Sequence, residues 1–201
     1  MPRQSTTAKA QASSGVGGAY LNVSKIPVGK EIRIALLPAD DGFQEYVEGF
    51  CCWGQSKENP KDRKPFRFET EPTREDIEAK MNQKGYTRGT NDRTGQLEEV
   101  KYFLTYAVWD YDASEVKVME INQKSIINGL NDIEAKEDDY PNLCEIDLTI
   151  GREDKSYKVT PVPRRRGTQA LITEAWNECA ENEFDLNRLF EMGNPFMAER
   201  S

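Results

Sequence analysis

Cations and aromatic residues alternate in two short stretches of this chain. Residues 57–68 hold five cations against two acids, with two phenylalanines among them: Lys57, Lys61, Arg63, Lys64, Phe66, Arg67 and Phe68. Further along, Lys101 precedes Phe103 by two residues. Lysine and arginine neutralise phosphates, aromatic rings stack on bases, and single-stranded nucleic acid is bound through this combination. The two stretches therefore predict a nucleic-acid-binding groove and not a reaction centre.

The residues that catalysis or metal binding would need are scarce. The sequence has no histidine, and its four cysteines include no CxxC pair, so a zinc site would need an unusual ligand set. A Gly-rich phosphate loop of the form GxxxxGKS or GxxxxGKT is also missing from the sequence. Aspartate pairs at 110 and 112 and at 138 and 139 fall in expected turns, where aspartate is favoured for backbone reasons. We expect no enzymatic activity, no metal and no cofactor.

Charge is distributed unevenly along the 201 residues. The net charge of −8 argues against a simple nucleic-acid binder. Residues 1–30, however, carry four cations and no acid, whereas residues 171–201 carry seven acids and two arginines. A basic head and an acidic tail indicate an electrostatic partner for the head and a docking or regulatory role for the tail. With no apolar run long enough to span a bilayer and no signal peptide, we expect a soluble, cytoplasmic protein without a membrane partner.

Two long strands in residues 101–123, joined by a tight turn at 110–114, position the second stretch. In the first of them, alternation separates two faces. The first face carries Val100, Tyr102, Leu104, Tyr106 and Val108 and suits a packed core. The second face carries Lys101, Phe103, Thr105, Ala107 and Trp109. Because it mixes a cation, two aromatic residues and small residues, the second face is predicted to be a binding surface.

The remaining pattern predicts a mainly β fold. We expect strands at 30–38 and 43–53 (the latter broken or bulged at Gly49), a helix at 124–136, and a hairpin of strands at 144–151 and 156–163. This order matches an OB-type five-stranded barrel with one helix before the last hairpin, plus one extra strand. The expected organisation is a disordered basic arm (1–19), an OB-fold domain (20–168) and an acidic helical tail (169–201). Residues 54–98 form a long insertion loop containing a helix at 74–84.

Four segments resemble one protein family. They are EIRIALLP, FQEYVEGFCCW, KYFLTYAVWDYDASEVKVMEINQKSIINGL and the last strand, SYKVTPVP. Across residues 30–165 the chain resembles the helix-destabilising single-stranded DNA-binding proteins of tailed bacteriophages. The resemblance implies an OB fold, sequence-independent binding of single-stranded DNA, and a role in phage DNA replication, recombination and repair in the host cytoplasm. It also implies a basic N-terminal arm that links neighbouring copies and an acidic C-terminal tail that contacts replication or recombination proteins.

The chain departs from the family in its long loop. Typical members hold zinc there with cysteine and histidine, and the loop after Trp53 has neither residue. We therefore expect a zinc-less loop. The predicted DNA-binding residues are Arg33, Trp53, Lys57, Lys61, Arg63, Lys64, Phe66, Arg67, Lys101, Phe103, Tyr106, Trp109, Arg164, Arg165 and Arg166.

Several alternatives stay open at this point. Phe103 could pack beneath the 54–98 loop, and residues 57–68 could form an ordinary solvated loop. Arg33 could bind a neighbouring carboxylate, and the arginines at 164–166 could be a charged strand exit. The acidic tail is expected to occupy the groove when DNA is absent, but a small helix packed on the barrel explains it equally well. A phage structural or protein-interaction module built on the same barrel is the alternative function, which the acidic net charge favours.

Overall fold

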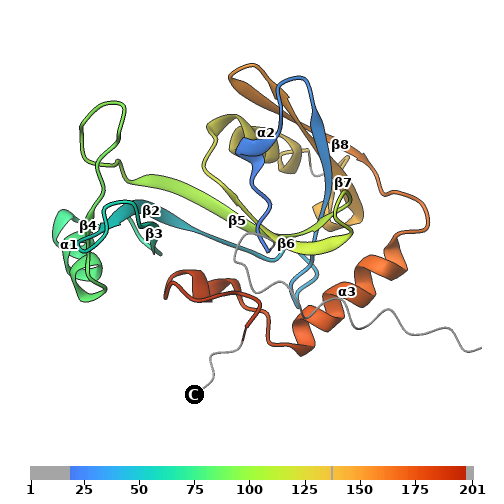
Figure 1. Ribbon diagram of the computed structural model, residues 1–201. Helices are drawn as coiled ribbons and strands as arrows, with labels where there is room; N and C mark the ends of the chain where they lie inside the picture. Colours follow the sequence, from blue (N-terminus) through green and yellow to red (C-terminus); the bar gives the residue numbers. More distant parts are fainter. Residues whose placement is uncertain (1–18, 137, 198–201) are drawn as a thin grey trace, which may run out of the picture.

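The computed structural model describes residues 19–136 and 138–197, which fold into one antiparallel sheet with three α-helices (Figure 1). The strands are β1 (Glu31–Leu36), β2 (Tyr46–Ser56), β3 (Arg63–Phe68), β4 (Tyr86–Arg88), β5 (Lys101–Asp110), β6 (Glu115–Ile121), β7 (Ile146–Glu153) and β8 (Ser156–Pro163). The helices are α1 (Arg74–Gln83), α2 (Lys124–Glu134) and α3 (Gln169–Glu181), and a 3-10 helix, η4 (Leu186–Leu189), follows α3. None of these helices of the described ranges is long and apolar enough to cross a membrane.

The fold is mixed, with helices on an open sheet, where the sequence predicted a mainly β chain. The strand order is β3-β2-β5-β1-β7-β8, with β6 paired to β5 and β4 paired to β2. Figure 1 shows β2 and β5 running as a long ribbon between two lobes. We call the part with β1, β6, β7, β8 and α2 the main lobe, and the part with β3, β4 and α1 the extension. The predicted arm lies, except for Ala19, outside the described residues.

The main lobe encloses the largest apolar core. The first face of β5 contributes Leu104, Tyr106 and Val108, as the alternation predicted. They pack with buried residues of β1, β6, β7 and α2, including Ile34, Leu36, Met119, Ile121, Ile126, Leu130, Leu148 and Ile150. The predicted strand pair, the helix before the last hairpin and the hairpin itself are confirmed as β5 with β6, α2, and β7 with β8. These elements determine which face of β5 packs in the main core and which face points away from it.

The extension is ordered by its own small core. The predicted helix is confirmed as α1, and it begins at a capping box in which Thr73 and Asp76 each accept a hydrogen bond from the other's backbone N–H. Two residues of α1, Ile77 and Met81, pack against residues of the strands beneath: Cys52, Phe66 and Tyr86. Apolar side chains therefore organise much of the 54–98 insertion, which the sequence left as a loop around one helix.

The C-terminal segment, which we define as residues 169–197, packs against the second face of β5 and against β6. Ile172 of α3 lies in a cluster with Ala35, Leu37 and Trp109. Leu186 and Leu189 of η4 pack on Val118 of β6, and Phe190 packs on Phe103. Figure 1 shows α3 and the following chain passing along one side of the β5 and β6 strands. The predicted tail is thus built into the fold through apolar contacts, and its helical part consists of α3 and the short η4.

Gly49 is required by close packing, because β2 is continuous through this position and has no break. A Cβ atom there would lie 2.3 Å from the carbonyl oxygen of Phe68 and 3.1 Å from the ring of Phe190. We expect Gly49→Ala to lower the free energy of unfolding by about 1–3 kcal/mol, since β3 must shift to admit the methyl group. Urea denaturation followed by circular dichroism measures this. Gly151→Ala is the control: its nearest atom would be 3.7 Å away, so stability should hold or rise slightly. Equal losses in both variants would refute the packing argument.

Candidate nucleic-acid interface

The middle of the predicted binding face is covered. Phe103 has no exposed surface and Trp109 is 2% exposed. The Phe103 and Phe190 rings lie 6.1 Å apart between centroids, and burial raises the pKa of the neighbouring Cys51 thiol to about 12. The cover is the C-terminal segment and not the 54–98 loop that was considered from the sequence. Neither aromatic residue can therefore stack on a base while this segment stays in place.

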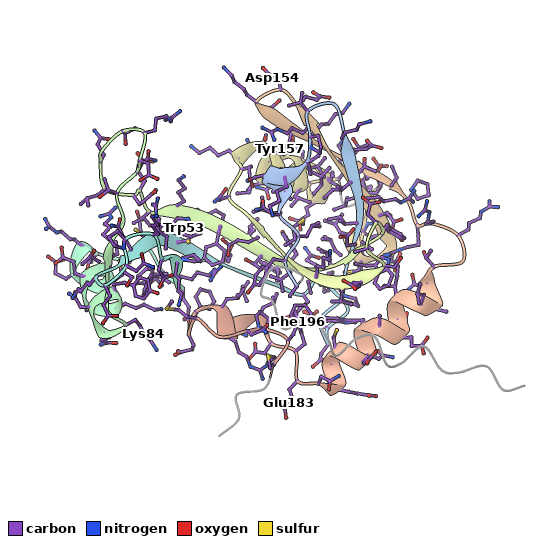
Figure 2. The ribbon with its side chains drawn as sticks, in the orientation of Figure 1. Trp53, Lys84, Asp154, Tyr157, Glu183 and Phe196 are labelled. Carbon is purple, nitrogen blue, oxygen red and sulfur yellow. The ribbon has the colours of Figure 1, made fainter. Side chains whose placement is uncertain are left out.

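The extension end of the second face is open. Lys101 lies directly opposite Cys51 on β2, and Trp53 is two residues further along the same strand, so all three belong to one face. Trp53 is 40% exposed, Lys101 is also exposed, and Pro65 of β3 is the cross-strand partner of Trp53. Figure 2 places Trp53 on the β2 and β5 ribbon where the extension begins. A ring with an open face beside a free ammonium group has the chemistry that stacks a base and binds its phosphate.

A hollow of about 660 Å³ continues from this end, between the edge of β3 and the C-terminal segment. Its cationic side chains are Lys64, Arg67 and Lys84, and Tyr20, Tyr86 and Met192 also line it. The Lys64 ammonium lies 5.5 Å from the centre of the Tyr86 ring. Lys84, at the end of α1 in Figure 2, forms no ion pair with any residue of the described ranges. The hollow therefore joins an aromatic edge to at least two cations that an anionic strand could reach.

Residues 57–68 do not act as one cationic wall. Arg63 is held by Glu98 at 2.5 Å and Asp92 at 3.5 Å, and Arg67 is held by Glu120 at 2.6 Å. Lys57, Lys61 and Lys64 remain exposed. Phe66, predicted to bind DNA, has no exposed surface because it lies in the core of the extension. The alternation of cations and aromatic residues thus reflects partly a strand with a buried face and partly a solvated turn.

Three of the four predicted arginines of the main lobe contact one buried carboxylate. Asp147 is fully buried and accepts a hydrogen bond from Arg33 Nε at 2.7 Å, with Arg164 Nη1 at 3.3 Å. The backbone N–H of Arg165 donates to the same carboxylate, and its guanidinium, like that of Arg33, lies 5.5 Å from the centre of the Tyr111 ring. Arg33 therefore meets a neighbouring carboxylate, the alternative left open from the sequence. Arg165 and Arg166 are both exposed, and the side chain of neither forms an ion pair with a residue of the described ranges.

A row of aromatic residues lies on the first face, which the alternation predicted to suit a packed core. We call Tyr46, Phe50, Tyr102 and Tyr106 the aromatic row. Tyr46 is directly opposite Tyr106, and Phe50 is opposite Tyr102. Tyr106, predicted to bind DNA, is 4% exposed, whereas Tyr46 and Tyr102 are 46% and 38% exposed. The alternation of Tyr46, Glu48 and Phe50 in β2 is the signal that could have identified this row from the sequence.

Comparison with protein-family models and with curated proteins finds no match to this chain. Among the described residues, no group of three or more histidine, cysteine, aspartate or glutamate side chains is arranged to hold a metal ion. The two candidate surfaces are therefore interpreted from their own geometry. One is the second face with the adjoining hollow, which carries the exposed cations Lys64 and Lys101, together with Lys84 and one acid, Glu191. The other is the aromatic row, which lies among carboxylates.

Proposed function

We propose that this chain binds single-stranded DNA without sequence preference, along the second face of β5 and β2. The observation that supports this most directly is Trp53, an exposed ring on the same face as the exposed cation Lys101. The hollow lined by Lys64 and Lys84 continues the surface. Stacking of bases on aromatic faces, with lysines along the backbone, gives affinity without reading base edges. No covalent chemistry is involved.

The strand connectivity supports an OB-type barrel as the framework. β1 and β2 both pair with the same side of β5, β1 at residues 108–110 and β2 at residues 101–106. If they count as one bent strand, the order becomes β1/β2, β5, β6, α2, β7, β8, and the extra strand counted from the sequence disappears. In such a barrel the β1–β7 pairing joins the first strand to the last hairpin, and α2 packs against β8. Oligonucleotides bind OB folds on the second and third strands, here β5 and β6.

In the proposed mechanism, one base stacks on Trp53 and the phosphates lie against Lys101 and the lysines of the extension. Longer DNA displaces the C-terminal segment and reaches Phe103. Because Arg33 and Arg164 are engaged by Asp147, their contribution is to hold the lobe together. The exposed arginines placed to meet phosphate are Arg165 and Arg166. The resemblance adds a place in phage replication and recombination, with the basic arm linking neighbouring copies and the tail contacting replication proteins.

Fluorescence anisotropy with labelled oligo(dT) at several salt concentrations tests the proposal. We expect the logarithm of the association constant to fall linearly with the logarithm of the salt concentration, because lysines displace counterions from phosphates. Trp53→Ala should weaken binding about 5- to 150-fold, the effect of losing one stacked base (roughly 1–3 kcal/mol). Lys101→Ala should make the slope of log association constant against log salt concentration shallower, by about the amount that one phosphate contact contributes.

The control is Phe43→Ala, which removes another exposed aromatic side chain (57% exposed, against 40% for Trp53) from the loop before β2. It should leave oligo(dT) affinity unchanged. Competition with duplex DNA and with RNA of the same length shows whether the chain prefers single-stranded DNA over these two competitors. Absence of binding at low salt, or equal losses for Phe43→Ala and Trp53→Ala, would reject the proposal.

The second candidate function is a phage structural or protein-interaction module on the same framework. The specific observation in its favour is the aromatic row, whose nearest charged groups are Glu48 and Glu134. Carboxylates repel a phosphate backbone, so this surface suits a protein better than DNA. The two functions are compatible because the two surfaces lie on opposite faces of the same strands.

A further inference from the structure

The aromatic row is a rigid surface. The Tyr46 and Tyr106 rings are stacked, with centroids 5.6 Å apart and planes 27° apart. Phe50 and Tyr102 meet edge to face, with centroids 5.9 Å apart. Tyr106 is anchored in the core of the main lobe, which fixes the ring on which Tyr46 rests. The exposed rings of Tyr46 and Tyr102 are therefore already ordered. A ligand that binds them avoids most of the entropy cost of immobilising these side chains.

The charges at this row are negative. Glu48 lies between Tyr46 and Phe50 along β2, on the same face and exposed. The Tyr102 hydroxyl donates a hydrogen bond to Glu48 Oε2 and fixes that carboxylate, and Oε1 has no partner among the described residues. Behind the row, Glu134 accepts a hydrogen bond from the Gln44 side chain at 2.6 Å. The row thus combines open rings with an oriented carboxylate that has a free acceptor atom.

The titration of the tyrosines agrees with this arrangement. Burial raises the pKa of Tyr106, and Glu134 and Glu48 raise it further. Burial also raises the pKa of Tyr102, as do its hydrogen bond and charge interaction with Glu48. The charged side chains that raise these two pKa values, Glu48 and Glu134, are acidic, whereas the exposed Lys101 projects from the opposite face. The acidic side chains at this surface repel a nucleic-acid backbone and attract a cation.

We propose that the aromatic row is a docking surface for an extended, arginine-bearing peptide segment of a partner protein. A guanidinium group stacks on the Tyr46 ring and donates hydrogen bonds to the neighbouring carboxylate of Glu48. Arginine fits better than lysine because its planar, weakly hydrated group stacks on rings and can bond a carboxylate through two N–H groups. Charge complementarity selects this occupant, and the row lies on the face opposite the proposed DNA site, so both ligands can bind together.

The test uses the full chain and fluorescein-labelled decapeptides of alternating arginine and proline, with lysine–proline and glutamate–proline peptides for comparison. Fluorescence polarisation should rank the arginine peptide first and detect no glutamate peptide. Tyr46→Ala should weaken arginine-peptide binding about 2- to 30-fold, the range for a cation on an aromatic face. Glu48→Gln should weaken it by a similar factor, while Glu178→Gln, at an exposed position of α3, serves as the matched control and should change nothing.

The readout that separates this inference from the proposed function is oligo(dT) affinity. Tyr46→Ala and Glu48→Gln should leave it unchanged, and saturating oligo(dT) should not displace the peptide. Loss of oligo(dT) binding in both variants would assign the row to DNA and overturn the inference. Equal affinity for the arginine and glutamate peptides, or equal binding by Glu48→Gln and the wild-type chain, would also overturn it. Circular dichroism of each variant verifies that the fold is intact.

Discussion

Replacing Asp147 with asparagine should lower the free energy of unfolding by about 3–5 kcal/mol, the cost of removing one partner from a buried ion pair. Asp147 has no exposed surface, and Arg33 Nε, the Tyr111 hydroxyl and the Arg165 backbone N–H all donate hydrogen bonds to its carboxylate. Arg164, whose side chain is only 14% exposed, would lose its counterion. The loss should be large because β1, the β5–β6 turn and the end of β8 converge on this one side chain.

Urea denaturation followed by tryptophan fluorescence measures the change. Asp112→Asn, at an exposed position of the β5–β6 turn, is the control and should stay within about 0.5 kcal/mol of the wild-type chain. A loss below about 1 kcal/mol in Asp147→Asn would mean that water already stabilises these arginines. The folded fraction of the variant should bind oligo(dT) with unchanged affinity. A stronger interaction would reveal that the released arginines contact phosphate in DNA-bound protein.

The partners in this ion-pair network could not be predicted from the sequence. Arg33 and Asp147 are separated by 114 positions, so no local pattern could pair them. The same reasoning could identify β5, β6 and α2, because alternation and helical spacing are properties of neighbouring residues. It could also place α1, whose capping box is a four-residue signal. Register and long-range pairing decide the remainder, since they depend on which strand folds against which.

The candidate site was predicted only in part for a related reason. Alternation correctly separated Tyr102 from Phe103, but it does not say which face another element covers. The second face is covered by residues more than 60 positions downstream, and part of the first face beyond the main core is open. The aromatic residue with the strongest sequence signal, Phe103, is therefore buried. Trp53, at the end of a strand, is the exposed one.

Removing residues 169–201 should raise affinity for oligo(dT) at least tenfold, the equivalent of about one additional stacked base. Phe103 and Trp109 are both covered by this segment and would become accessible. Because the truncated chain also loses part of its apolar packing, Phe190→Ala is the decisive variant. It uncovers Phe103 and leaves α3 against Trp109. Anisotropy with oligo(dT) and thermal unfolding of both variants measure the two effects separately.

The control separates apolar cover from charge competition. Glu178→Gln, Glu181→Gln and Glu191→Gln together neutralise exposed acids of the segment and keep Phe190 in place. If the segment blocks the face by packing, this triple variant should change oligo(dT) affinity far less than Phe190→Ala does. An equal rise in both would favour the electrostatic competition that the charge pattern of the sequence predicted. Unchanged affinity in Phe190→Ala and in the truncated chain would remove Phe103 from the DNA site.

The energies involved predict a dependence on DNA length. Leu186, Leu189 and Phe190 are each at most 8% exposed, and burying such side chains contributes about 1.5–3 kcal/mol apiece. One stacked base contributes roughly 1–3 kcal/mol of binding free energy, so several further bases are needed to displace the segment. Short oligo(dT) should therefore occupy only the open end at Trp53, and affinity should rise steeply once the strand is long enough to reach Phe103. Phe190→Ala should flatten that rise. A length dependence identical to that of the wild-type chain would show that DNA never enters beneath the C-terminal segment.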